Sequence, residues 1–205
     1  MSEARYVLGE SGAPLAPRPA VGDTDDMARV NGAWIFVLIE AAIFGSYFVT
    51  YMIRRMAAPE QFLNSQALLS QDFGVVNTLI LLLSSWFVAR CVLAARQGER
   101  ARASTMLVLT MGAGGVFVAS KLIEWSIEIG RGLTLTTNEF FSFYYFLTGI
   151  HVLHVLIGLI FLSVAWLQLR ETTPRASPAV EVGALVWHMI DFLWVMIFAL
   201  VYVMR

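Results

Sequence analysis

The chain has 205 residues, of which 58% are hydrophobic and only 14% are charged, with a formal net charge of −1. A soluble globular domain carries about 25% charged residues, so water is not the main solvent of this chain. The balanced charge and the scattered arginines provide no basic surface, which argues against nucleic acid as a partner.

The first segment, residues 1–30, combines three prolines with a cluster of aspartates. This composition is typical of a flexible polar tail and lacks the apolar run of a signal peptide. We therefore expect a tail on the cytoplasmic side, and the helix that follows it should be retained in the mature protein.

Five later stretches are long and apolar enough to cross a bilayer. A spanning helix needs roughly 20 mostly apolar residues, because each backbone amide must find its partner inside the segment. We place the spans at residues 31–53, 75–95, 103–127, 140–169 and 180–204. Since the connections are short, the sequence predicts an all-α, integral membrane bundle of five transmembrane helices over residues 31–205.

Arginines at the helix ends predict the orientation. Eight of them flank the helices on the side of the N-terminus and four on the opposite side. Arg90 lies inside the second predicted helix and can extend its guanidinium toward the first side. The positive-inside rule then predicts a cytoplasmic N-terminus and an external C-terminus in the cell inner membrane.

Ionisable residues at the centre of the bilayer are expected to have an interaction partner or a functional role. The free energy of inserting each one is unfavourable by roughly 2.5–3.5 kcal/mol on insertion scales. Glu40, His154 and Asp191 share the predicted midplane. With a rise of 1.5 Å per residue, His151 lies about 4.5 Å to one side of it and His188 about 6 Å to the other. We expect these side chains to face the protein interior, with a contact between Glu40 and His154.

Three interpretations of this polar layer stay open. Its members can be packing residues whose hydrogen bonds are satisfied and that set the register between helices. They can also be groups that take up and release protons, or ligands of a metal or haem. The two histidines of helix 140–169 are three residues apart, and metal sites with that spacing usually add glutamates from neighbouring helices. We therefore predict no metal site and no cofactor in this chain.

Other polar and aromatic residues lie near the predicted helix ends. Lys121 and Glu124 are expected to form a solvated or lipid-headgroup edge, and Trp34 and Trp125 to belong to the interfacial aromatic belt. Together with Arg90 they are candidates for contact with a partner or a lipid headgroup. Catalytic motifs such as HExxH, a phosphate-binding glycine loop, GxSxG or CxxC do not occur, so the sequence predicts no active site of its own.

An ordered set of motifs covers all five predicted helices and resembles subunit III of the haem-copper oxidases. The set comprises Gly32-Ala-Trp-Ile-Phe with Glu40, Asn77-Thr78 before Leu83-Ser84-Ser85, Glu124-Trp125, Phe140-Phe141 through Gly149, His151-Val-Leu-His154-Val with Gly158, and Trp187-His188 with Asp191 and Trp194. The chain looks like the short five-helix form of that family. The run from Phe143 to Gly149 also looks like the branch associated with nitric oxide reductase.

The resemblance implies a subunit without haem or copper that packs on the haem-containing catalytic subunit I, contacts phospholipid, and supports proton uptake and lasting activity there. The carboxylate of the family maps onto Glu40 and its histidine partner onto His154. The resemblance leaves open whether the enzyme reduces oxygen or nitric oxide, and whether the electron donor is cytochrome c or quinol.

Two other classes of function compete with this one. An independent proton channel or carrier could use the polar layer, although transporters usually show repeated halves and broken helices that this sequence lacks. A haem-binding cytochrome could use His188 and a histidine of helix 140–169 as its two ligands.

Overall fold

The computed structural model describes residues 21–171 and 178–204, and over these residues the chain is helical without a β-strand. Five of the described helices are long and apolar enough to cross a membrane. The predicted all-α bundle of transmembrane helices is therefore confirmed. Residues 1–20 of the expected polar tail lie outside the described part.

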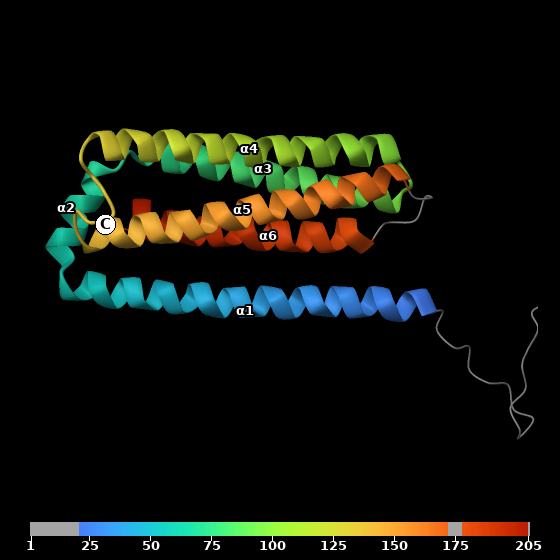
Figure 1. Ribbon diagram of the computed structural model, residues 1–205, viewed down its shortest axis with the longest axis horizontal. Helices are drawn as coiled ribbons and strands as arrows, with labels where there is room; N and C mark the ends of the chain where they lie inside the picture. The colour runs from blue at the N-terminus through green and yellow to red at the C-terminus, as the bar shows by residue number, and fades with distance from the viewer. Residues whose placement is uncertain (1–20, 172–177, 205) are drawn as a thin grey trace, which may run out of the picture.

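The helices follow one another in an up-and-down order (Figure 1). Helices α3, α4, α5 and α6 pack side by side as a four-helix bundle, and α1 lies along one flank of it, mainly against α6. The short α2 crosses one end of the bundle, near the C-terminus of the chain. The bounds are α1 Val21–Ala57, α2 Pro59–Leu68, α3 Gln71–Arg96, α4 Arg100–Gly130, α5 Glu139–Glu171, α6 Pro178–Phe198 and the π-helix η1 Ala199–Val203.

Two elements differ from the sequence-based expectation. Helix α1 begins at Val21, ten residues before the predicted start of the first span at residue 31, so part of the expected tail is helical. The connection between the first two predicted spans contains a further short helix, α2, which the sequence analysis does not place. Proline is favourable at the first position of a helix, where its missing N–H is not needed, and Pro59 occupies that place.

Two glycines let a large indole into the centre of the bundle. A Cβ atom on Gly114 of α4 would lie 2.7 Å from the Trp187 ring, and one on Gly158 of α5 would lie 3.0 Å from it. Trp187 of α6 is fully buried there, and its Nε1 donates a hydrogen bond to Ser84 Oγ of α3 at 3.0 Å. Small residues that allow close approach are the main means of packing helices in a membrane.

The last turn of the chain widens from an α-helix into η1, and other helices bind its carbonyl groups. The Tyr51 hydroxyl of α1 donates to the Leu200 carbonyl at 3.1 Å, and Gln71 Nε2 of α3 donates to the Tyr202 carbonyl at 2.8 Å. Carbonyl groups at a helix end have no partner within the helix, so these bonds satisfy them. The C-terminal segment is thereby joined to both α1 and α3.

Candidate functional site

Glu40 of α1 and His154 of α5 form a contact at the seam between their helices. His154 Nε2 lies 3.2 Å from Glu40 Oε2, so the predicted pairing is confirmed. His154 Nδ1 lies 2.8 Å from the Ile150 carbonyl oxygen, which can only accept a hydrogen bond. Nδ1 must therefore carry a hydrogen, and Nε2 is the ring nitrogen that faces the carboxylate.

This pair lies on the wall of a cavity rather than in the centre of the bundle. The side chains of His154 and Glu40 are 14% and 15% exposed. The cavity has a volume of about 400 Å³, and α1, α5 and α6 line it with mostly apolar groups such as Phe36 and Phe161. The Phe44 ring covers the imidazole edge-on at 5.4 Å between centroids. The pair thus lies in a mostly apolar setting and is partly accessible from outside the bundle.

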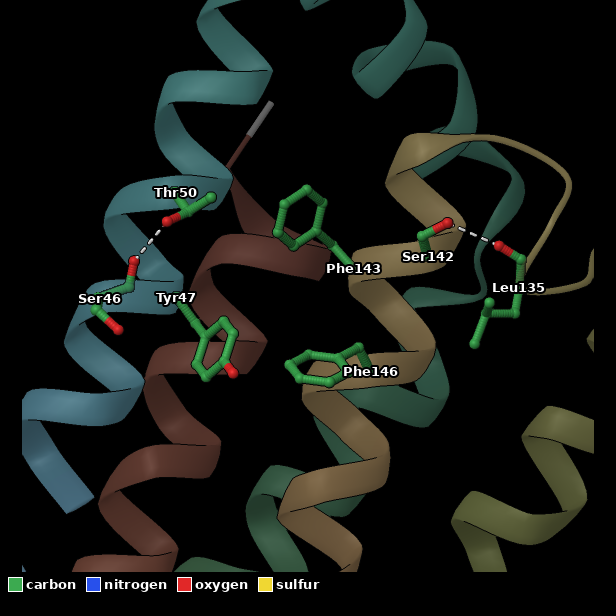
Figure 2. A pocket seen from close by; sticks show the side chains of 7 residues that line it. All are labelled: Ser46, Tyr47, Thr50, Leu135, Ser142, Phe143 and Phe146. Atoms are coloured by element: carbon green, nitrogen blue, oxygen red, sulfur yellow. Dashed lines mark hydrogen bonds between the residues drawn. The ribbon is translucent and has the colours of Figure 1, made fainter.

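A second cavity of about 490 Å³ continues the same seam toward the end where α2 lies. Figure 2 shows Tyr47 of α1 and Phe146 of α5 facing each other across it, with ring centroids 5.0 Å apart. The nearby hydroxyls of Thr50 and Ser142 donate to backbone carbonyls, at 2.8 and 2.7 Å, and not into the cavity (Figure 2). The lining of this cavity is therefore mostly apolar, with the Tyr47 hydroxyl as a polar group in addition to those bonded hydroxyls.

The other members of the predicted polar layer do not join this pair in one network. His188 Nδ1 lies 2.7 Å from Ser85 Oγ of α3. His151 is fully buried between the rings of Phe117 and Trp194. Neither ring nitrogen of His151 and neither carboxylate oxygen of Asp191 has a hydrogen-bond partner among the described residues.

Lys121 and Glu124 correct one expectation, because both are fully buried and form no solvated or headgroup edge. Lys121 Nζ lies 3.0 Å from Glu124 Oε2 and 2.9 Å from the Tyr202 hydroxyl. The Tyr144 hydroxyl donates to Glu124 Oε1 at 2.9 Å, and Tyr202 donates to the same oxygen. The charged face of α4 turns toward α5 and η1, where two tyrosines complete the hydrogen bonds of a buried ion pair.

The sequence does not predict the two tyrosine partners of this ion pair. Tyr202 lies at a helix end, where aromatic residues are common, and Tyr144 lies in an aromatic run that gives no sign of its contacts. A usable signal was the i, i+3 spacing of Lys121 and Glu124, which permits a pair on one face of a helix.

The remaining candidates lie at the periphery of the helices. Trp34 is 52% exposed near the start of the membrane span of α1. Trp125 is half-buried, and Lys121 Nζ lies 5.9 Å from the centre of its ring. Arg90 is half-buried on α3.

The described residues contain no group of three or more His, Cys, Asp or Glu side chains close enough to hold a metal ion. Each histidine has a different environment: Glu40 faces His154, aromatic rings enclose His151, and Ser85 binds His188. Within this part of the chain, Glu40 and His154 form the contact that permits hydrogen bonding between a carboxylate and an imidazole on the wall of a cavity.

Comparison with known proteins places the chain in a family. The family model for cytochrome c oxidase subunit III matches residues 27–205. The quinol oxidase subunit 3 of Bacillus subtilis (strain 168) is 28% identical, with 96% of this chain and 95% of that protein covered. The cytochrome c oxidase subunit 3 of Synechocystis sp. is 35% identical over 86% of this chain and 76% of that protein. The cytochrome bo(3) ubiquinol oxidase subunit 3 of Pseudomonas putida is 29% identical, with 85% of each chain covered. The chain therefore belongs to the cytochrome c oxidase subunit III family.

Proposed function

We propose that this chain is a non-catalytic subunit of a bacterial respiratory haem-copper oxidase, and that Glu40 and His154 hold an exchangeable proton close to the catalytic subunit. The 3.2 Å contact of these side chains on the wall of a cavity is the observation that carries the proposal. Haem and copper belong to the partner subunit in this proposal, and the chain acts on proton supply and on the durability of the enzyme.

The position of the pair favours a proton-handling role over packing alone. A pair that only set helix register would be best placed in the core, where it would be shielded from exchange. Glu40 and His154 instead face the cavity between α1, α5 and α6, from which a proton or a water molecule can approach. Buried carboxylates and histidines within membrane spans commonly mark such proton-exchange sites.

We further propose that a phospholipid acyl chain covers the 490 Å³ cavity of the seam, at the end where α2 lies, and leaves the cavity beside Glu40 and His154 open. The hydroxyls of Thr50 and Ser142 at that covered cavity are bonded to backbone carbonyls. The N-terminus lies on the cytoplasmic side in this arrangement, as the arginine distribution indicates.

Affinity purification of the full chain from its native membrane tests the proposal. We expect it to copurify with a subunit that binds haem and copper, and the Soret absorption of the preparation should belong to that partner. The identity of the partner also separates an oxygen-reducing oxidase from the nitric oxide reductase alternative. A chain that purifies alone and conducts protons in vesicles would instead support the channel hypothesis, and a Soret band in the isolated chain the cytochrome hypothesis.

A further inference from the structure

Asp191 of α6 is a buried carboxyl group without a partner. Its residue is 4% exposed, and neither of its side-chain oxygens has a hydrogen-bond partner among the described residues. The ion pairs of the described part of the chain do not include it. Burying a polar group without a partner is unfavourable, and burying a charge without one is far more so. The side chain therefore calls for a proton and for contact with water.

The side chains around Asp191 supply a path for a proton. His188 precedes it by three residues in α6, so the two lie on one face of that helix. His188 Nδ1 is 2.7 Å from the Ser85 hydroxyl oxygen of α3. The Asp191 carboxyl group is close to the same hydroxyl, although it makes no regular hydrogen bond with it. An imidazole, a hydroxyl and a carboxyl group thus converge between α3 and α6.

His188 also connects this group to one end of the bundle. A cavity of about 520 Å³ lies between α1, α3 and α6, and His188 is half-buried on its wall. Arg96 and Glu181 line the same cavity where α3 finishes and α6 begins, and their side chains are 59% and 36% exposed. Glu181 and His188 are seven residues apart, which corresponds to about 10 Å along the helix axis. Water can therefore reach the imidazole from that end.

We infer that Asp191 is a second proton-binding site, held as a neutral carboxylic acid and supplied from this cavity through His188 and Ser85. A proton enters at the other ring nitrogen of His188, and Nδ1 passes its hydrogen to the Ser85 oxygen. The hydrogen that leaves Ser85 passes to a carboxylate oxygen of Asp191. An imidazole and a hydroxyl can each accept one hydrogen while donating another, so only the carboxyl group changes its charge. Release of the proton follows the same path in reverse.

Titratable groups on the other helices are engaged elsewhere. Glu40 of α1 contacts His154 of α5, and Lys121 of α4 pairs with Glu124. Aromatic rings enclose His151 of α5. The Glu40–His154 pair also lines a different cavity, of about 400 Å³. The inference therefore does not rest on the proposed function of that pair, and either one can fail without the other.

Infrared spectroscopy of the purified full chain tests whether the buried carboxyl group is protonated. A protonated carboxyl group has a carbonyl stretching band above the amide I band, whereas exposed carboxyl groups are ionised in neutral buffer. We expect such a band in the wild type, and we expect it to shift when the side-chain carboxyl carbons of aspartate are ¹³C. Asp191→Asn should remove the band. Asp72→Asn, at an exposed aspartate of α3, is the matched control and should leave it in place. A wild-type spectrum without an aspartate band would overturn the inference.

The rate at which this band shifts after transfer to heavy water tests the path, and the measurement leaves Asp191 itself unchanged. We expect exchange in the wild type. Ala89→Phe should slow it several-fold by filling the 520 Å³ cavity, which Ala89 lines. Ser85→Ala should also slow it several-fold, because it removes the hydroxyl through which the proton passes.

Two matched variants control for the added ring and for the lost hydroxyl. Ile157→Phe adds a ring at the 400 Å³ cavity, and Ser163→Ala removes a hydroxyl that donates within its own helix, α5. Both should exchange at the wild-type rate. A wild-type band that does not exchange would contradict the inference, as would a wild-type rate in either Ala89→Phe or Ser85→Ala.

Discussion

At the scale of single residues, the Lys121–Glu124 and Glu40–His154 pairs differ in how far they are enclosed. The Lys121–Glu124 pair is enclosed, and two tyrosine hydroxyls donate to its carboxylate. The Glu40–His154 pair has fewer partners and faces a cavity. Full enclosure favours a structural role because it hinders proton exchange, and the more exposed Glu40–His154 pair is the one that we propose to exchange a proton.

Replacing Glu40 by glutamine should shorten the time for which the partner enzyme stays active and leave its initial turnover rate almost unchanged. An amide cannot take up a proton at neutral pH, but it keeps the shape of the side chain. In the assembled complex we expect initial turnover near the wild-type rate, followed by a several-fold faster loss of activity during sustained turnover. Glu139→Gln, which alters an exposed ion pair with Arg54, serves as the control. Immediate and complete loss of activity in the assembled Glu40→Gln complex would contradict the proposed role.

Removing Lys121 should destabilise the isolated chain strongly, because Glu124 would be left buried without its cation. Breaking a buried pair from one side costs about 3–5 kcal/mol. Unfolding of Lys121→Met by a denaturing detergent, followed by circular dichroism, should show this loss. The double variant Lys121→Met with Glu124→Gln should recover part of it. Wild-type stability of the single variant would contradict a stabilising role of the ion pair.

At the scale of helices, the close approach of one helix to another depends on small residues at specific positions. Gly114 and Gly112 lie two residues apart on α4, yet only Gly114 faces the Trp187 ring. A Cβ atom at Gly112 would have no neighbour within 4 Å. The position of a glycine around the helix axis therefore determines whether it matters for packing.

This difference predicts opposite outcomes for two alanine substitutions. Gly114→Ala should destabilise the bundle by about 1–3 kcal/mol, the usual cost of overpacking a filled core. Gly112→Ala should be neutral or slightly stabilising, since alanine favours helix more than glycine does. Thermal unfolding of the two variants in the same detergent measures the difference. Equal melting temperatures would show that Trp187 can move aside without cost.

At the scale of the whole molecule, five spans place the two ends of the described chain at opposite ends of the bundle (Figure 1). The connection between α3 and α4 lies at the same end as the start of α1, and the connection between α4 and α5 at the other. The orientation proposed from the arginines then assigns the first connection to the cytoplasm and the second to the outside.

Labelling of single cysteines in intact cells tests that orientation. Gln97 and Thr136 are exposed in the two connections, and the natural Cys91 is buried, so background labelling should be low. A membrane-impermeant maleimide should label Thr136→Cys from outside and reach Gln97→Cys only after the cells are opened. The reverse pattern would invert the proposed orientation.

The sequence by itself determined the class of fold, the number of helices long enough to cross a membrane, and the contact between Glu40 and His154. It could do so because hydrocarbon requires about 20 apolar residues per span and forces each backbone amide to pair within its own helix. The constant helical rise then places Glu40 and His154 at one level, and their contact could be predicted. Tertiary structure decided how each helix is rotated about its axis. That rotation buried Lys121 and Glu124 against η1, and it brought Arg96 to Glu181. Lipid satisfies apolar side chains on any face, so hydrophobic pattern alone does not specify the rotation, and close packing between helices does.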